Sequence, residues 1–225
     1  MTHRIENRRA IENRPGLSRR RLLEALAAAP LVLSGCSSLV PGQGPPPNLY
    51  RLTPKPEIPD TLPKVNWQLE VEVPNAPASL DSTRVALLHD PSQFEYYARA
   101  NWVDRAPLLI QSLLIEFFES SGKILSVGRD SSDFRPDYVL STELRDFQME
   151  YFPGPLPSAH VGMNARMISI RQRSIIASRR FDQLAPASAD RIESAVAAYS
   201  VALGKTLDEI VAWTIESGEA DRKSG

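Results

Sequence analysis

Hydrophobic and polar positions follow two periods along the chain, and these periods predict the order of strands and helices. Residues 65–73 alternate apolar and polar side chains, which predicts a half-buried strand. Residues 105–121 and 190–215 instead repeat apolar positions every three or four residues, which predicts two amphipathic helices. Further strands are predicted at 50–52, 84–89, 94–102, 124–127, 138–151, 161–170 and 174–184.

Both helices carry signals at their ends. Asp104 precedes the first helix and is predicted to cap it, with Pro107 in its first turn and Gly122 after its last residue. Asp190, with Glu193 three residues later, fits a capping box that opens the second helix.

The longest predicted strand changes phase within itself. Its apolar side chains lie on one face over 138–144 and on the other over 147–151, so a β-bulge is predicted near Asp146. A loop at 152–157 follows, and a turn at 171–173 joins the next two strands into a hairpin. The order of strands, helix, strands, helix predicts a single α/β domain with a mixed β-sheet on which both helices pack.

The N-terminal segment has the pattern of an export signal. Residues 1–21 hold seven arginines against two glutamates, and residues 22–33 form a short, mostly apolar stretch. A membrane-spanning helix needs roughly 20 apolar residues, whereas a basic segment before a short apolar one is typical of a secretory signal peptide. Residues 18–23 also resemble the twin-arginine motif, so the sequence leaves two export routes open.

The tetrapeptide Leu33-Ser34-Gly35-Cys36 directly follows the apolar stretch and resembles the lipobox of bacterial lipoprotein precursors. In such precursors the cysteine sulfur receives a diacylglyceryl group, and a peptidase then cuts before it, here between Gly35 and Cys36. The resemblance implies that Cys36 is lipidated and that acyl chains such as palmitate anchor the protein in a membrane. Ser37, rather than Asp, implies sorting to the periplasmic face of the outer membrane of a Gram-negative bacterium.

These signals divide the chain into four predicted parts. Residues 1–35 are the signal peptide, 36–48 the lipidated cysteine and a flexible Pro-rich tether, 49–217 the folded domain, and 218–225 a disordered C-terminal tail. Polyproline-like chain rises about 3.1 Å per residue, so the tether spans roughly 35 Å. Because the signal peptide holds seven positive and three negative charges, its removal shifts the net charge from -1 to -5.

Composition leans away from an enzyme. The balance of 26 Lys+Arg and 27 Asp+Glu gives no basic surface for nucleic acid. A single cysteine excludes an internal disulfide and a thiolate zinc site. Neither His89 nor His160 has a second histidine near it in sequence, and no nucleophile elbow is present. We therefore expect no catalytic residues, no cofactor and no metal.

Short motifs along the chain, taken in order, resemble the ABC-type transport auxiliary lipoprotein family, the PqiC-like proteins. The resemblance runs from Tyr50 to Trp213, and Val103 departs from it, since the family usually has Ala there. The motifs are Tyr50-Arg51-Leu52, Tyr96-Tyr97, Asn101-Trp102, Tyr138-Val139-Leu140, Leu144-Arg145-Asp146-Phe147, Phe181, Ala197-Ala198-Tyr199, Ala202-Leu203 and Trp213.

This resemblance implies a function and partners. Members are periplasmic lipoproteins without catalytic residues. They work with an Mce-domain protein and an inner-membrane permease or ATPase to move lipids or other apolar molecules between membranes, and they dock the outer-membrane end of the bridge. Self-association fits such a role. The alternative is a structural or assembly lipoprotein that tethers another envelope complex, for example a secretion or Tol-like machine.

Two segments are candidates for the partner surface. Tyr96 and Tyr97 point to opposite sides of a strand, so at least one is a candidate exposed anchor, while packing in the core is the competing interpretation. The loop at 152–157 carries Phe152 and Leu156. It either inserts into a partner or membrane or is an ordinary turn between strands.

Overall fold

The computed structural model describes residues 45–130, 135–152 and 154–224. The predicted signal peptide, Cys36 and most of the tether lie outside the described residues. The described elements are β1 (Asn48–Tyr50), β2 (Gln68–Val71), β3 (Arg84–Asp90), β4 (Gln93–Trp102), α2 (Ala106–Ser121), β5 (Ser126–Gly128), β6 (Tyr138–Glu150), β7 (Ser158–Ser169), β8 (Ser174–Pro186) and α3 (Ile192–Ser224).

Strand β6 is the centre of a mixed sheet of eight strands. One of its edges pairs in parallel with β2 near its start and with β3 near its end. Its other edge pairs with β7 in antiparallel fashion along nearly the whole strand, and β8 continues the sheet beyond β7. Strand β4 adds to β3 in antiparallel fashion, and β1 and β5 complete the sheet in parallel.

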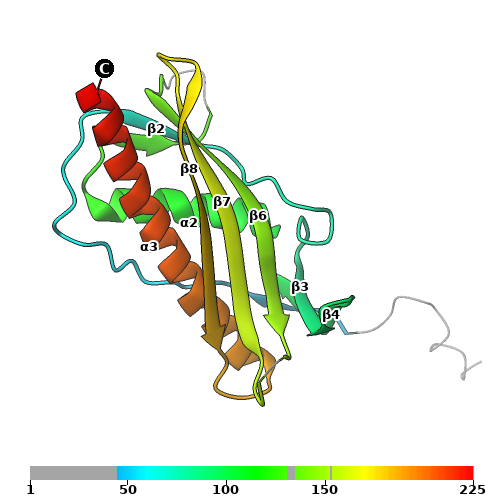
Figure 1. Cartoon of the computed structure of the whole chain (residues 1–225). Helices are drawn as coiled ribbons and strands as arrows, with labels where there is room; N and C mark the ends of the chain where they lie inside the picture. Colours follow the sequence, from blue (N-terminus) through cyan, green and yellow to red (C-terminus); the bar gives the residue numbers. More distant parts are fainter. Residues whose placement is uncertain (1–44, 131–134, 153, 225) are drawn as a thin grey trace, which may run out of the picture. The chain divides into compact units, whose positions relative to one another are not determined.

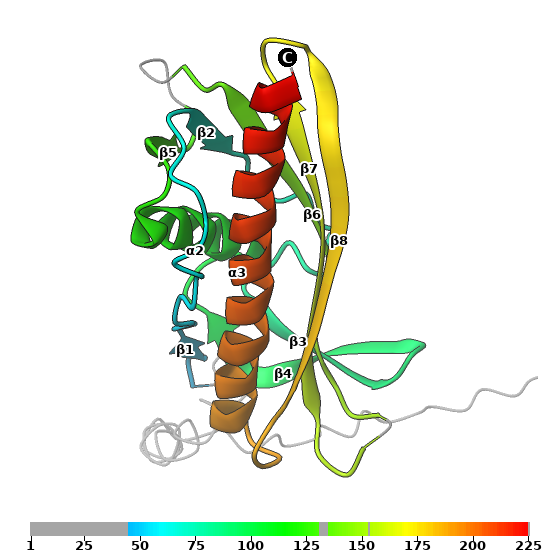
Figure 2. The same cartoon turned by 60° about the vertical axis from the view of Figure 1, so that its left-hand side comes forward.

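Both helices pack on the same face of this sheet, as Figures 1 and 2 show. Helix α3 runs along β7 and β8, and α2 crosses behind it near β2 and β5. The mixed sheet with two helices in one domain confirms the predicted α/β fold. Within the described residues no helix combines the length and the apolar character needed to cross a membrane.

The predicted disordered tail is wrong for residues 218–224, because α3 extends to Ser224 rather than ending near 215. Gly218 lets the helix approach the sheet closely: a Cβ there would lie 2.7 Å from Trp67 and from Met167. One turn further, the Asp221 carboxylate accepts hydrogen bonds from the Tyr138 hydroxyl at 2.8 Å and from the Gln172 amide at 2.7 Å. These contacts hold the last two turns.

The structure changes the predicted start of α2. Arg105 is the residue that precedes its first turn, and no side chain caps it. Asp104 instead accepts a hydrogen bond from the backbone N–H of Arg105 at 2.7 Å. The predicted end is confirmed, since Gly122 adopts a left-handed φ of 59° and its N–H bonds the carbonyl of Glu119.

Helix α3 begins at Ile192, two residues beyond the predicted cap. The Asp190 carboxylate accepts a hydrogen bond from the Tyr151 hydroxyl at 2.8 Å. Among the strands, β2 is shorter than the alternation at 65–73 predicts, because parallel pairing with β5 and β6 covers only 68–71. The bulge near Asp146 is confirmed by a register shift between Leu144 and Asp146.

Three aromatic rings lock α3 to the sheet. Trp102, Phe147 and Tyr199 are fully buried, and their ring centroids lie 4.9 to 5.8 Å apart. The Tyr199 hydroxyl also donates a hydrogen bond to the carbonyl of Ala86 at 3.0 Å. A single helical side chain therefore contacts residues of β3, β4 and β6.

Candidate functional site

The β3–β4 hairpin and the loop between β6 and β7 lie at the same end of the domain (Figure 1). The tip of the hairpin projects from the sheet on the side opposite the helices (Figure 2). Tyr151 ties the two segments together, because its N–H bonds the carbonyl of Leu88 at 2.9 Å and its ring lies 4.6 Å from that of His89. This end contains all four candidate partner residues.

Tyr96 and Tyr97 are both half-buried, and both anchor the hairpin. The Tyr96 hydroxyl donates to the carbonyl of Ser79 at 3.1 Å, and the guanidinium of Arg84 lies 3.5 Å from the centre of its ring. On the other side of the strand, the Tyr97 and Tyr151 hydroxyls are 2.9 Å apart. The predicted opposite orientation fits these contacts, in which the two phenols hold the hairpin on the domain.

The phenols of Tyr97 and Tyr151 form a chain of hydrogen bonds with Asp190, and burial is the main reason why the pKa of each phenol is raised. Burial raises the pKa of Tyr97, although its hydrogen bond to Tyr151 lowers it. Burial also raises the pKa of Tyr151 strongly, and the hydrogen bonds to Tyr97 and Asp190 raise it further. Because Tyr97 belongs to β4, Tyr151 follows β6 and Asp190 precedes α3, this chain connects three segments that are far apart in sequence.

The loop at 152–157 presents the apolar side chain of Leu156 to solvent. Phe152 is half-buried, and the buried Pro157 accepts a hydrogen bond from the N–H of Ala187 at 2.8 Å. Leu156 between them is 41% exposed. At the same end, Phe94 of the hairpin is 39% exposed. The alternation of side chains along the strand does not predict that this aromatic residue faces solvent.

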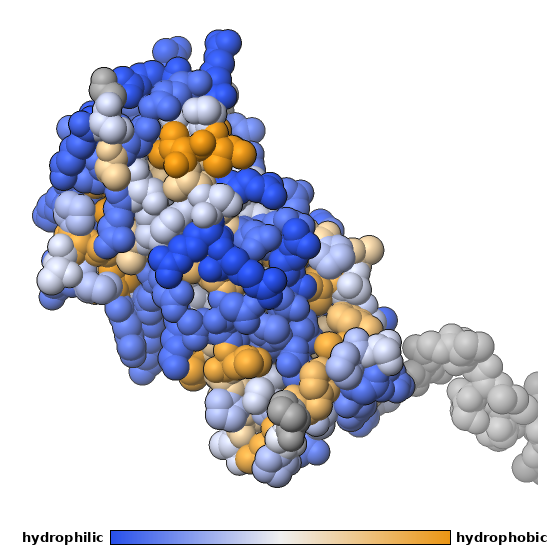
Figure 3. All heavy atoms as spheres, viewed as in Figure 1, coloured by the Kyte–Doolittle hydropathy of each residue, from blue (hydrophilic) through white to orange (hydrophobic). Residues whose placement is uncertain are grey.

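A polar cluster occupies the face of β6, β7 and β8 that lies opposite the helices, where Figure 3 shows hydrophilic side chains gathered. His160 lies between two carboxylates: its Nδ1 is 2.6 Å from Glu150 and its Nε2 is 2.8 Å from Asp182. Arg180 pairs with both Asp182 and Asp146. His160 is isolated in sequence, and only the register of the three strands brings these charges together.

Gly162 makes room for this cluster. A Cβ at this position would lie 2.3 Å from Oδ2 of Asp146, so a larger residue would displace that carboxylate. His160, Asp146 and Asp182 offer ligand atoms within 4.8 Å of one another. Arg180 already pairs with both carboxylates, however, and an imidazole that bonds two carboxylates donates from both nitrogens. The cluster is therefore a closed ion-pair network, and its donor set does not favour a metal.

The two contacts of His160 require the imidazolium, because a neutral imidazole has a single N–H to donate. Burial by itself lowers the pKa of His160, but the hydrogen bonds to Glu150 and Asp182 outweigh burial and raise it above 6.5. Burial raises the pKa of Asp182, but its bonds to Arg180 and His160 outweigh burial and lower it. The cluster is thus built to hold a positive charge on β7.

Replacing His160 with Gln is expected to remove a pH-dependent part of the stability. Because the folded pKa of His160 is raised, its contribution is fully present below 6.5 and is lost as pH rises through the folded pKa. The difference in free energy of unfolding between the two proteins should therefore shrink as pH rises. Urea unfolding from about pH 5 to about pH 9 measures it. A difference that stays constant over this range would contradict the assignment.

Comparison with known proteins gives the family. The model of the ABC-type transport auxiliary lipoprotein component family matches residues 50–211. A crystal structure of a Xanthomonas campestris protein of the DUF330 family is 31% identical and superposes with a TM-score of 0.75; the alignment covers 78% of this chain and 99% of that one. Another solved structure, of an uncharacterized protein, is 16% identical with a TM-score of 0.53 over 80% of this chain and 100% of that one, a likeness of fold alone.

A curated relative is more distant. An uncharacterized protein of Bradyrhizobium diazoefficiens is 24% identical over 190 residues, which cover 82% of this chain and 49% of the relative. The chain therefore spans about half the length of that protein. The family model covers most of the chain, and the Xanthomonas structure shares both its fold and nearly a third of its aligned residues. This chain belongs to the ABC-type transport auxiliary lipoprotein component family.

Proposed function

We propose that this protein is a non-enzymatic auxiliary component of an Mce/ABC-type system that moves lipids or other apolar molecules between the inner and outer membranes. The match of the family model to residues 50–211 carries this proposal. In it, the mature chain begins at a lipidated Cys36 on the periplasmic face of the outer membrane. The tether at 37–48 spaces the domain from that membrane, and the domain docks an Mce-domain protein that works with an inner-membrane permease or ATPase.

The packing of the domain supports docking rather than carriage of a lipid inside the fold. Large side chains fill the space between the sheet and the helices, among them the fully buried Trp67, Trp102 and Tyr199. Interiors packed in this way have few voids larger than a water molecule. We therefore place the transported molecule outside the hydrophobic core, in the bridge that the domain helps to assemble.

The end that carries Leu156 and Phe94 is the docking surface in this proposal. Exposed apolar side chains at the tips of a loop and a hairpin are suited to fill pockets on a partner. The hydrogen bonds of Tyr97 and Tyr151 hold these tips in place, so the surface is preorganised.

A photoreactive amino acid at position 156 is expected to capture an Mce-domain protein in intact cells. The matched control is the same amino acid at Val201, which is 51% exposed on α3 and equally apolar. Mass spectrometry of the captured proteins identifies the partner. Dominant capture of a secretion or Tol-like component from position 156 would instead support the alternative of a structural lipoprotein, and equal capture from both positions would remove the docking surface.

Self-association is also part of the proposal, because several copies of a docking protein are able to surround the end of one bridge. Crosslinks between copies of this chain in the same experiment would support it. With the photoreactive amino acid at position 94 instead, Leu156→Asp is expected to weaken partner capture about tenfold, since it places a charge at the centre of the contact.

A further inference from the structure

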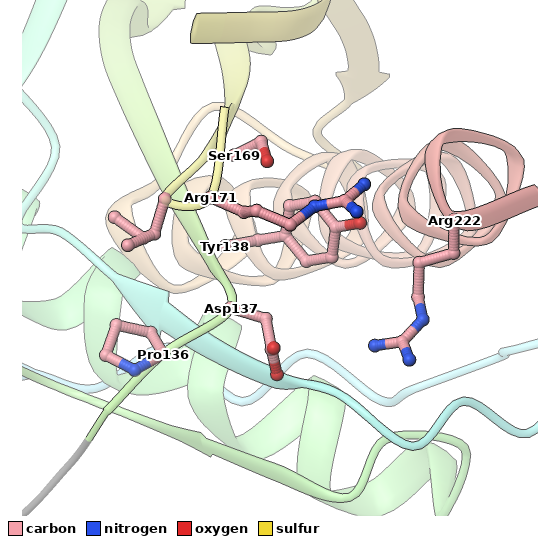
Figure 4. A pocket seen from close by; sticks show the side chains of 7 residues that line it. Pro136, Asp137, Tyr138, Ser169, Arg171 and Arg222 are labelled. Carbon is pink, nitrogen blue, oxygen red and sulfur yellow. The ribbon is translucent and has the colours of Figure 1, made fainter. Parts of the chain in front are cut away.

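A pocket of about 410 Å³ lies at the other end of the domain (Figure 4). Helix α3 starts beside Tyr151 and ends at this pocket, and a helix of 33 residues is about 50 Å long. The start of β6, the turn between β7 and β8, and the last turn of α3 form its walls. It is lined by Pro136, Asp137, Tyr138, Ser169, Ile170, Arg171 and Arg222.

Two arginines from different elements face this pocket. Arg171 belongs to the turn after β7 and Arg222 to the end of α3, and Figure 4 shows both guanidinium groups on the side toward which the Tyr138 hydroxyl points. Among residues 45–130, 135–152 and 154–224, neither guanidinium has a hydrogen-bond or ion-pair partner. Burial and the bond to Asp221 raise the pKa of Tyr138, whereas the charges of Arg222 and Arg171 lower it, which agrees with their position beside the phenol.

The carboxylates around the pocket are already bonded to other groups. Asp137 accepts a hydrogen bond from the backbone N–H of Gln68 at 2.8 Å. Asp221 accepts bonds from Tyr138 and Gln172. Both carboxylates thus have bonding partners within the described part of the protein, whereas the two guanidinium groups do not, and the negative charge of Asp137 moderates the field of these cations.

We propose that this pocket binds a phosphate group, either of a lipid headgroup or of a free phosphate. Guanidinium groups match phosphate oxygens in paired, charge-assisted hydrogen bonds, and two of them from separate elements are able to grip one phosphate from two sides. The volume exceeds that of a phosphate and is within the range of ligand pockets. Ile170, which is 47% exposed, adds an apolar wall beside the arginines. A phosphate with an apolar substituent fits both features.

A lipid as the source of this phosphate rests on the proposed function. Within that function, the pocket identifies phosphate-bearing lipids as molecules that the domain contacts. The test uses the purified domain from residue 46, the compact unit that contains every described element. Calorimetric titration with inorganic phosphate and with dihexanoyl phosphatidic acid measures the two sources separately. Partner capture through Leu156 is a different measurement at the opposite end, so failure of one does not imply failure of the other.

Arg171→Gln and Arg222→Gln are each expected to weaken binding at least about tenfold. Asp137→Asn is expected to strengthen it, since it removes a negative charge and keeps an acceptor for Gln68. Arg166→Gln is the matched control, because it removes the same charge from an exposed site on β7 outside the pocket. Unchanged circular dichroism spectra establish that each variant folds.

Binding of both probes with this pattern of variants supports a phosphate site open to either source. Binding of phosphatidic acid alone, with a further loss in Ile170→Ser, supports the lipid headgroup as the source. Binding of inorganic phosphate alone supports a free phosphate. Two results would overturn the proposal. One is that neither probe binds at concentrations up to about 10 mM. The other is that Arg166→Gln weakens binding as much as the pocket variants do.

Discussion

Replacing Cys36 with Ser is expected to abolish lipidation and to remove the protein from the outer-membrane fraction. The hydroxyl of Ser does not form the thioether that holds the diacylglyceryl group. Each buried CH₂ of an acyl chain contributes about 0.8 kcal/mol to membrane binding, so loss of all chains removes the anchor entirely. The acidic mature chain has no electrostatic substitute, because anionic headgroups repel it. Labelling with radioactive palmitate and density-gradient fractionation measure both effects.

Ser37 supplies the controls for this experiment. Ser37→Ala is expected to keep both the label and the outer-membrane position. Ser37→Asp is expected to keep the label but to retain the protein in the inner membrane, which separates lipidation from sorting. Retention of the palmitate label by Cys36→Ser would show that the anchor lies elsewhere.

Replacing Tyr199 with Ala is expected to lower the free energy of unfolding by about 3–5 kcal/mol, as for other buried aromatic side chains. The ring is fully buried against Trp102 and Phe147, and its loss leaves a cavity where α3, β4 and β6 meet. The change also removes the hydrogen bond to Ala86. Urea unfolding followed by circular dichroism measures the loss.

Tyr199→Phe separates packing from hydrogen bonding. It keeps the ring and removes only the hydroxyl, so we expect a loss of about 1 kcal/mol. An exposed control on the same helix, Val201→Ala, is expected to change stability by less than about 0.5 kcal/mol. If Tyr199→Ala costs no more than Tyr199→Phe, the aromatic cluster does not hold α3 on the sheet.

Local patterns predicted much of this fold. Apolar patterns and helical spacing predicted both helices and most of the strands, although several boundaries moved by two or more residues and the strand predicted at 50–52 shares only Tyr50 with β1. The change of phase near Asp146 predicted the bulge that the register shift confirms. These predictions succeed because each depends on side chains within one element, where the period of burial is visible along the chain.

The end of α3 depends on contacts with residues that are distant in sequence. Beyond residue 215 the apolar repeat fades, so a tail of glycine and charged residues was predicted to be disordered. The structure keeps it helical because Gly218 fits against Trp67 and because Asp221 bonds Tyr138, a residue 83 positions away. The decisive partners belong to strands, and no pattern within the helix reports them.

The sequence by itself determined the family, the α/β order of elements, and the export and lipidation signals that we carry into the proposal, because these depend on short motifs and local periodicity. Only the tertiary structure placed Leu156 and Phe94 at one end, surrounded His160 with carboxylates from neighbouring strands, and brought Arg171 beside Arg222. Such sites combine residues tens of positions apart, and sheet register and helix packing decide which of them meet.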